Sequence, residues 1–419
     1  MRIALFSECY TPVTNGVVTS IVTLRETLCA LGHTVYVCAP GAPQPDDDLD
    51  VFRLPELPFP RHPYHFARPF PRLHVDFAAL NVDIIHCQHP FTVGRLGADT
   101  ATRFGLPLVY TAHSLYDNMA TYSKSPLMRT MGQKAARGVV KRFCEKASYV
   151  ITPSQSTLDF LRGEGVRGRF AVVPSGVFCP NVREGAREEK RAELGLTPET
   201  PLLLYVGRLG PEKRIDMIFQ SLANLQKQDL PLPLSNFRIA LIGDGLCHEE
   251  LGILAAELGI QKHIHFAGAQ PHDTIGEWYV AADIFAMASP EETQGLVLVE
   301  AMAAGLPCVA VALGGAQEVV VHNETGFSVP FEETAFTEAL ATLLLNPALC
   351  QQFGVRGLER ARTVYSPEAM AKGVLGVYDL ALRYSRPPAV SSSKKSVQKL
   401  TARIKKLQRQ RERARKLRR

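Results

Sequence analysis

Short apolar runs that resemble buried β-strands alternate with helical segments, and this alternation occurs twice along the chain. The first half contains RIALF, TVYVCAP, VDIIHCQ, PLVYTAH and ASYVITPS, and the second contains LLLYVGRL, FRIALIGDG, HIHFAG, DIFAMAS and PCVAVA. Strands that are apolar throughout and are joined by helices predict parallel sheets covered on both faces. Because 419 residues are too many for one hydrophobic core, the prediction is an α/β protein with two Rossmann-like, doubly wound domains.

A change of character around residues 175–200 separates the two halves. This stretch reads as a loop, a charged helix and turn residues, and it is the predicted hinge. The predicted domains are therefore residues 1–180 and 181–365, with a helix over 366–385 that crosses back and a linker and basic tail over 386–419. Since open α/β sheets bind ligands at the carboxyl ends of their strands, we expect a central cleft between the two facing sheets.

The cysteines and the hydropathy pattern indicate the compartment. The nine cysteines form no CxxC pair and show no regular spacing, which favours a reducing compartment over a disulfide framework or structural zinc. The N-terminal MRIALF is expected to be a strand and not a signal peptide, and no long uncharged apolar window predicts a transmembrane helix. We therefore expect a cytoplasmic protein.

Glycine and two cations occupy positions where a phosphate could bind. Gly16 opens a helix shortly after the first strand, where backbone can approach a ligand at a helix N-terminus. Arg208 and Lys213 follow the strand LLLYV, and both side chains can hold phosphate oxygens. The alternatives are a simple turn at Gly16 and a solvated charged loop at 208–213.

The segment EETQGLVLVEAMAAG places two carboxylates around an apolar helix start. Glu292 precedes Gln294, Gly295 and Leu296, which begin the predicted helix, and Glu300 lies a little over one turn inside it. A carboxylate in an apolar setting needs partners, and sugar or ribose hydroxyls would supply them. The alternative is a pair of structural acids bound to Lys or Arg.

Histidines provide one further candidate. His113 follows the strand PLVYTA and should face the same cleft, although a structural role is the alternative for any single histidine. We interpret His86 and His89 as structural, because no carboxylate or thiolate cluster completes a metal site with them. No metal and no other cofactor is therefore expected.

Over about residues 1–385 the chain resembles the retaining glycosyltransferases of family 4. The resemblance rests on five segments that occur in this order: NGVVTSI, TAHS, VGRLGPEKRID, GDG and EETQGLVLVEAMAAGLP. The resemblance implies a GT-B fold, a nucleotide-sugar donor and transfer of a hexose. It implies catalytic roles near the transferred sugar and diphosphate for His113, Arg208, Lys213 and Glu292. It also implies donor-binding roles for Gly16, Gln294, Gly295, Leu296 and Glu300.

The acceptor expected from the resemblance is a membrane lipid. The segment EETQG and the aromatic stretch after His113 are similar to the corresponding segments of bacterial diacylglycerol glucosyltransferases. This resemblance implies that the transferred group is glucose and that the donor is UDP-glucose. The alternatives are a mannosyl- or hexosyltransferase of phosphoinositide or polysaccharide synthesis, and a non-catalytic, membrane-recruited binding protein. A sugar-nucleotide epimerase would need an acid/base set that the sequence does not offer.

Two basic segments favour a location at the inner face of the cell membrane. The predicted helix 124–143 carries an apolar stripe beside Lys and Arg, and its members are Met128, Met131, Ala135, Val139 and Phe143. An ordinary surface helix with its stripe in the core is the alternative.

The tail 391–419 holds 13 Lys or Arg and one acid, Glu412. We expect it to bind an anionic bilayer in preference to nucleic acid, a solvated disordered tail being the alternative.

Deletion of residues 391–419 should weaken binding to anionic vesicles and make it less salt-sensitive, because each basic residue near such a surface contributes about 1 kcal/mol. Co-sedimentation with phosphatidylglycerol vesicles at two salt concentrations measures this, with neutral vesicles as the control. Equal binding by the full and the shortened chain would remove the tail from the account.

Overall fold

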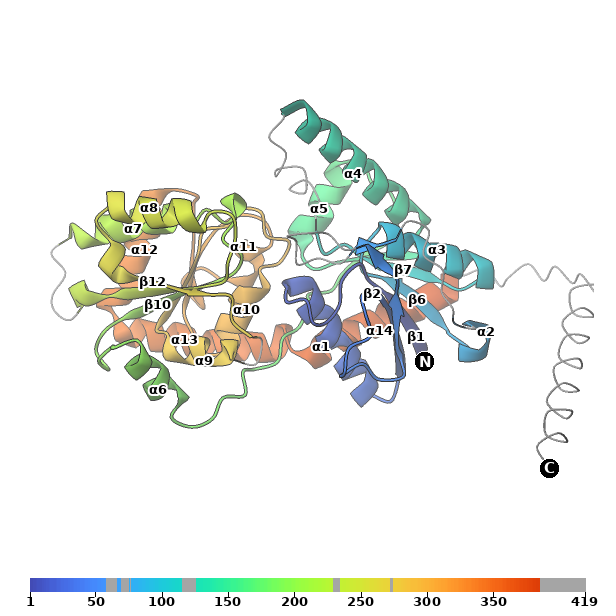
Figure 1. Cartoon of the computed structure of the whole chain (residues 1–419), viewed down its shortest axis with the longest axis horizontal. Helices are drawn as coiled ribbons and strands as arrows, with labels where there is room; N and C mark the ends of the chain where they lie inside the picture. The colour runs from blue at the N-terminus through green and yellow to red at the C-terminus, as the bar shows by residue number, and fades with distance from the viewer. Residues whose placement is uncertain are drawn as a thin grey trace, which may run out of the picture. The chain divides into compact units, whose positions relative to one another are not determined.

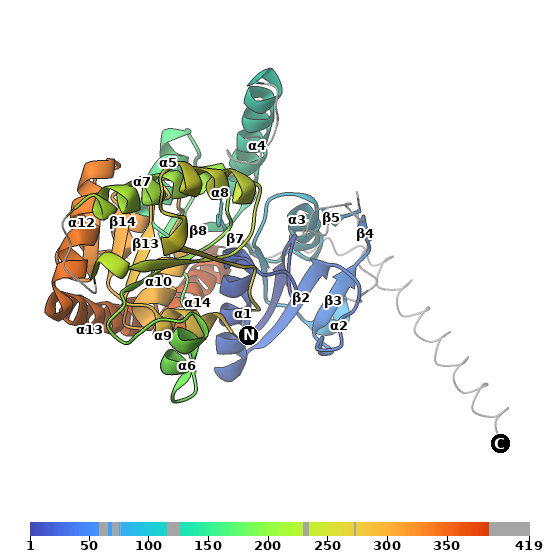
Figure 2. The same cartoon turned by 60° about the vertical axis from the view of Figure 1, so that its left-hand side comes forward.

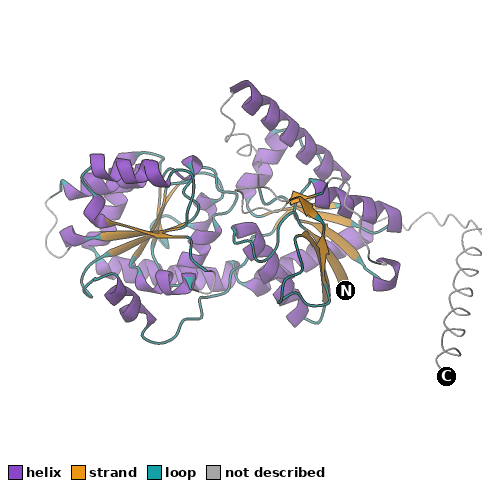
Figure 3. Ribbon diagram, viewed as in Figure 1, coloured by secondary structure: helices purple, strands orange, loops and turns teal. Residues whose placement is uncertain are grey.

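Two parallel β-sheets, each with helices on both faces, organise the computed structural model (Figures 1 and 3). The structure describes residues 1–57, 66–68, 75, 77–114, 126–228, 234–271 and 274–384. The predicted basic tail therefore lies outside the described residues. Residues 1–383 form one compact unit.

The first sheet has the strand order β3-β2-β1-β6-β7-β8-β9, and every neighbouring pair is parallel. Its strands are β1 (Arg2–Phe6), β2 (Thr34–Pro40), β3 (Val51–Leu54), β6 (Ile84–Cys87), β7 (Leu108–Thr111), β8 (Tyr149–Thr152) and β9 (Phe170–Val172). The helices between them are α1 (Gly16–Ala30), α2 (Phe77–Leu80), α3 (Thr92–Phe104), α4 (Pro126–Lys146) and α5 (Gln155–Gly163). A short antiparallel pair, β4 (Glu56–Leu57) and β5 (Phe66–Ala67), follows β3.

The second sheet has the order β12-β11-β10-β13-β14-β15 and is also parallel throughout. Its strands are β10 (Leu202–Val206), β11 (Arg238–Ile242), β12 (Ile264–Gly268), β13 (Ile284–Met287), β14 (Cys308–Val311) and β15 (Gly326–Val329). Its α-helices are α6 (Ala186–Glu193), α7 (Ile215–Gln226), α8 (His248–Glu257), α9 (Ile275–Ala281), α10 (Leu296–Ala303), α11 (Ala316–Val319), α12 (Glu333–Leu345) and α13 (Pro347–Val364). Short 3-10 turns occur at η2 (Pro211–Lys213), η3 (Leu234–Asn236) and η4 (Gln261–His263). The predicted α/β class with two Rossmann-like sheets is confirmed.

Alternate residues of each strand enter different cores, as the two-residue period of a strand requires. In β1, Ile3 and Leu5 pack into one cluster while Ala4 and Phe6 pack into the other. In β10, Leu203 and Leu204 are divided in the same way between two further clusters. Both faces of both sheets are therefore buried, which explains why the strand sequences are apolar throughout instead of alternating.

The last described helix, α14 (Pro367–Tyr384), returns to the first sheet. Its buried side chains join the cluster of Ile3, Leu5 and Ile21 on one face of that sheet. Tyr378 Oη lies 2.7 Å from His86 Nδ1, and His86 Nε2 lies 2.7 Å from Thr111 Oγ1. Burial lowers the pKa of His86 to about 3, so this histidine is a neutral core residue that ties α14 to β6 and β7.

Each sheet contains one point where the chain reverses the direction in which it adds strands. In the first sheet β1 lies between β2 and β6, and in the second sheet β10 lies between β11 and β13. Open α/β sheets bind ligands outside the carboxyl ends of the strands at such points. The loops after β1, β10 and β13 are therefore the positions where the fold itself favours a site.

Helix α4 leaves most of the described residues of the predicted apolar stripe outside the core. Its core-packing side chains are Ala136, Val140, Phe143 and Cys144. Only Phe143 of the predicted stripe is buried, since Met131 is 62% exposed, Ala135 is exposed and Val139 is half-buried; the side chain of Met128 lies outside the described residues. Only the second half of α4 lies over the core, while its first half extends past the sheet (Figures 1 and 2). The membrane role of the stripe stays a prediction.

Removal of the Tyr378 hydroxyl should destabilise the fold by about 1–3 kcal/mol, because it leaves the buried His86 Nδ1 without its partner. The comparison is between Tyr378→Phe and Lys372→Ala, an exposed change on the same helix that should alter the free energy of unfolding by less than about 0.5 kcal/mol. Urea unfolding followed by circular dichroism measures both. Equal midpoints for Tyr378→Phe and the unmodified chain would contradict this role.

Candidate active site

The loop after β10 holds Arg208 in a fixed backbone. Gly207 N donates to Ile242 O, and Leu209 N donates 3.0 Å to Asp244 O, so the loop is bonded to the end of β11 and the loop that follows it. The buried Tyr205 hydroxyl donates 3.0 Å to Arg208 O. The Arg208 guanidinium lies 2.7 Å from Glu212 Oε1, and 47% of its side chain is exposed. A cation is thus held at the carboxyl end of the central strand with its outer face open to solvent.

Lys213 and Glu292 join the loops after β10 and β13. Lys213 Nζ lies 2.6 Å from Glu292 Oε1, and the two side chains are 23% and 16% exposed. Burial alone would raise the pKa of Glu292, but the charge and hydrogen bond of Lys213, with help from Ser289 and Arg208, hold it below its usual range. Glu292 is therefore an ionised carboxylate that orients Lys213 at the strand-order reversal.

Helix α10 begins directly after this pair. Gly295 precedes it with φ of +86°, a left-handed conformation that favours glycine, and Leu296 is the first helical residue. The first N–H groups of a helix have no partner within it and favour an anion. The predicted helix start at 294–296 thus lies beside the two cations from the loop after β10.

Glu300 lies within α10 and has a partner that the sequence did not suggest. Tyr279 Oη, from α9, donates 2.7 Å to Glu300 Oε2. Burial raises the pKa of Glu300 to about 7, and the hydrogen bond from Tyr279 only partly offsets this. The carboxyl group can therefore change protonation state near neutral pH.

The first domain contributes the start of α1. Asn15 Oδ1 accepts 2.9 Å from Val18 N and caps this helix, of which Gly16 is the first residue. A Cβ added at Gly16 would lie 3.3 Å from Leu296 Cδ1. The starts of α1 and α10 are therefore in contact across the two domains, and any larger side chain at Gly16 would intrude there.

His113 follows β7 and meets the same loop of the second domain. Its Nε2 lies 2.7 Å from Gln88 Oε1, and its backbone carbonyl accepts 2.8 Å from Thr293 Oγ1. Burial, with smaller contributions from His89 and His86, lowers the pKa of His113 to about 3. The imidazole is consequently neutral, so it can act through hydrogen bonds but not as a positive charge.

Gln294 joins the domains through its side chain. Its Oε1 accepts 2.8 Å from Ser175 N, and its Nε2 donates 2.8 Å to Ser175 O. Both ends of this buried amide are therefore occupied by first-domain backbone, and a donor-binding role for Gln294 stays a prediction. The neighbouring Thr293 O accepts from Ser154 Oγ, which strengthens the same junction.

The structure thus groups the predicted residues in two sets. Arg208, Lys213, Glu292 and the start of α10 share one strand edge, and Gly16 and His113 approach it from the other domain. Sequence reasoning missed Tyr279 and Ser175, which lie far from their partners in the chain and belong to no motif. Glu212, four residues after Arg208, is the ion-pair partner that orients it.

Two absences hold for the described part of the chain. Its His, Cys, Asp and Glu side chains form no group of three that could hold a metal ion. Within the same ranges, no helix has the length and apolar character needed to cross a bilayer.

Two family models cover most of the compact unit. Residues 14–179 match Glycosyltransferase Family 4, and residues 186–360 match Glycosyl transferases group 1. The two matches therefore divide the chain at the loop before α6.

Individual relatives agree with these models. The chain is 32% identical to an α-monoglucosyldiacylglycerol synthase of Acholeplasma laidlawii, over 74% of this chain and 80% of that protein. It is 33% identical to a D-inositol 3-phosphate glycosyltransferase of Nocardia farcinica, over 72% of this chain and 67% of that protein. The crystal structure of Anabaena HepE in complex with UDP-glucose superposes with a TM-score of 0.68 at 20% identity, covering 90% of this chain and 99% of that one, and is thus similar in fold.

Lys213→Ala should weaken binding of UDP about 10–100-fold, because a hydrogen bond from a charged donor is lost and Glu292 keeps its charge at the site. Lys262→Ala, at an exposed position in η4, is the matched control and should leave the dissociation constant unchanged. Isothermal calorimetry measures both. If Lys213→Ala bound UDP with the same affinity as the unmodified chain, Lys213 would not contact the diphosphate.

Proposed function

The chain belongs to Glycosyltransferase Family 4 and is a glycosyltransferase, and on that premise we propose that it transfers glucose from UDP-glucose, with retention, to a membrane lipid such as diacylglycerol. The observation that carries the proposal is the set of Arg208, the Lys213–Glu292 pair and the start of α10 at one strand edge. These groups offer a leaving nucleoside diphosphate two cations that are held in position by carboxylates, together with the N–H groups of a helix start. The similarity to the α-monoglucosyldiacylglycerol synthase supports the glucosyl donor and the neutral lipid acceptor.

In the proposed reaction the bond between the anomeric carbon and the β-phosphate oxygen breaks, and its electron pair leaves with UDP. The acceptor hydroxyl bonds to the same face of that carbon, and its proton passes to the leaving phosphate. Arg208, Lys213 and the N–H groups at the start of α10 would stabilise the growing negative charge without a metal. Each such donor is worth roughly 2–4 kcal/mol in the transition state.

The remaining predicted residues would hold the rest of the donor. Glu292 would accept from sugar hydroxyls while it keeps Lys213 in position, and Glu300 would accept from ribose hydroxyls in place of the Tyr279 hydroxyl. The neutral His113 would lie near the transferred sugar, and Gly16 and Gly295 would leave room for phosphate beside Leu296. A direct donor contact for Gln294 would require its amide to leave Ser175.

The similarity to a D-inositol 3-phosphate glycosyltransferase supports a second candidate, hexosyl transfer to a phosphorylated cyclitol or to phosphoinositide. The two candidates differ in the charge of the acceptor head. For transfer to diacylglycerol, we propose that the enzyme works at the inner face of the cell membrane, as a peripheral protein held by the basic tail 391–419 and by the exposed part of α4 around Met131.

A panel of UDP- and GDP-sugars with dioleoylglycerol micelles or inositol 3-phosphate tests the proposal. Mass spectrometry of the products should detect glucosyldiacylglycerol from UDP-glucose, and the coupling constant of its anomeric proton in an NMR spectrum should show that the α configuration of the donor is kept. A product only on inositol 3-phosphate would establish the second candidate instead, and the absence of any product would refute both.

Donor affinity should depend on pH through Glu300. Because burial raises its pKa to about 7 and ribose hydroxyls need the ionised form, UDP should bind about ten-fold more weakly at pH 6 than at pH 8. Glu300→Gln removes this titration. At each pH the dissociation constant of the unmodified chain is divided by that of Glu300→Gln, because this ratio cancels the titration of UDP itself. A ratio that does not change with pH would exclude binding of the ribose by the ionised Glu300.

A further inference from the structure

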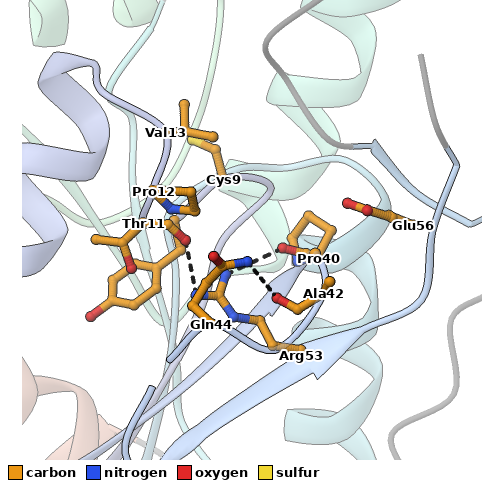
Figure 4. A pocket seen from close by; sticks show the side chains of 11 residues that line it. Cys9, Thr11, Pro12, Val13, Pro40, Ala42, Gln44, Arg53 and Glu56 are labelled. Atoms are coloured by element: carbon orange, nitrogen blue, oxygen red, sulfur yellow. Dashed lines mark hydrogen bonds between the residues drawn. The ribbon is translucent and has the colours of Figure 1, made fainter. Parts of the chain in front are cut away.

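The segment after β6 lies beside the loop after β1, where the first sheet reverses its strand order. Gln88 N donates 2.8 Å to Phe6 O, so the pairing of β1 with β6 continues to this residue. The loop after β1 then passes through Cys9, Thr11 and Val13, which line a pocket at the carboxyl end of that strand (Figure 4). Gln88, which is only 1% exposed, is therefore at the edge where open α/β sheets bind ligands.

Contacts from two directions fix the backbone around Gln88. Helix α3 packs so closely that a Cβ added at Gly94 would lie 1.7 Å from His89 O. Glu8 Oε1 accepts 2.6 Å from Val93 N at the start of the same helix, and Glu8 N donates 3.2 Å to His89 Nδ1. Because burial lowers the pKa of His89 to about 4, its ring is neutral and can accept this bond. The loop after β1 and α3 thus hold the segment that carries Gln88.

The side chain of Gln88 determines which nitrogen of His113 carries the proton. His113 Nε2 lies 2.7 Å from Gln88 Oε1. A carbonyl oxygen can only accept, so Nε2 must be the protonated nitrogen. Since burial lowers the pKa of His113 to about 3, the ring has one proton at neutral pH, and its Nδ1 is left as an acceptor. His113 can therefore accept a hydrogen bond through Nδ1 but cannot donate one there.

Stability alone does not explain an amide at position 88. Within the described ranges of the chain, the buried Gln88 Nε2 has no hydrogen-bond partner. A buried donor without a partner costs free energy, which an apolar side chain of similar shape would avoid. The contact that only the amide can supply is the oxygen that accepts from His113. The orientation of His113 is therefore the better explanation of this residue.

From these contacts we propose that Gln88 is a positioning residue of the transfer reaction. It holds His113 with Nδ1 unprotonated, so that the imidazole accepts a hydrogen bond from a hydroxyl of the transferred sugar. The inference rests on the proposed function, which places His113 near that sugar. The backbone of His113 is fixed as well, because its carbonyl accepts 2.8 Å from the hydroxyl of Thr293, the residue after Glu292. Both the ring and the backbone of His113 are thus oriented before a donor binds.

NMR of the full chain with isotopically labelled histidine tests the arrangement without any substrate. A protonated and an unprotonated ring nitrogen differ strongly in chemical shift, and His113→Asn identifies the signals of His113 by their absence. Near neutral pH the unmodified chain should show a proton on Nε2 of His113 and none on Nδ1. A proton on Nδ1 would overturn the inference.

Kinetics with UDP-glucose and dioleoylglycerol micelles test the effect on transfer. Gln88→Met, which is similar in length but offers no amide oxygen, should lower kcat about 10–100-fold, because a slightly misplaced positioning group can cost this much. The KM for the lipid and the dissociation constant of UDP should not change, and unchanged UDP binding also shows that the variant folds. Gln351→Met, at an exposed position of α13, is the matched control and should leave all three values as they are.

A double variant separates positioning from a structural role. Because Gln88 acts through His113, adding Gln88→Met to His113→Asn should lower kcat by less than about two-fold further. A further loss as large as that caused by Gln88→Met alone would overturn the inference, as would an unchanged kcat in Gln88→Met. If the unmodified chain glucosylates no acceptor, the proposed function has failed, and the NMR spectrum still decides whether Gln88 sets the protonation of His113.

Discussion

The ion pair between Lys213 and Glu292 connects the fold of the second domain to its chemistry. It joins the loops after two adjacent central strands, β10 and β13, at a distance of 2.6 Å. Glu212 holds Arg208 in the same way. Each carboxylate fixes a cation in place before any ligand arrives, and donors fixed in advance need no reorganisation when charge develops. A diphosphate would therefore meet cations that are already oriented.

Both domains contribute to this arrangement because each sheet reverses its strand order at the edge that carries the site. The loop after β1 leads to Gly16, which touches Leu296 at the start of α10. The side chain of Gln294 and the hydroxyl of Thr293 bond to first-domain backbone next to that contact. The segment that holds Glu292 is thus also the segment that joins the domains, so a ligand that moves it would also affect the junction between them.

Much of the fold and of the site could be predicted from the sequence, for identifiable reasons. Strands buried on both faces are apolar throughout, so runs such as RIALF and LLLYV marked the sheets directly. Polar residues after such runs must lie at the carboxyl edge, which is how Arg208, Lys213 and His113 were found. Other features depend on contacts between distant segments. Neither Tyr279 beside Glu300 nor Ser175 beside Gln294 is in a motif, and the buried face of α4 depends on how much of the helix overlies the core.

The most direct test of the central claim is a crystal structure of the chain with bound UDP. The account predicts that oxygens of the diphosphate lie within about 3.2 Å of the Arg208 guanidinium, Lys213 Nζ and the N–H groups at the start of α10. A structure in which the diphosphate is bound away from these groups, with Lys213 still paired only to Glu292, would contradict it.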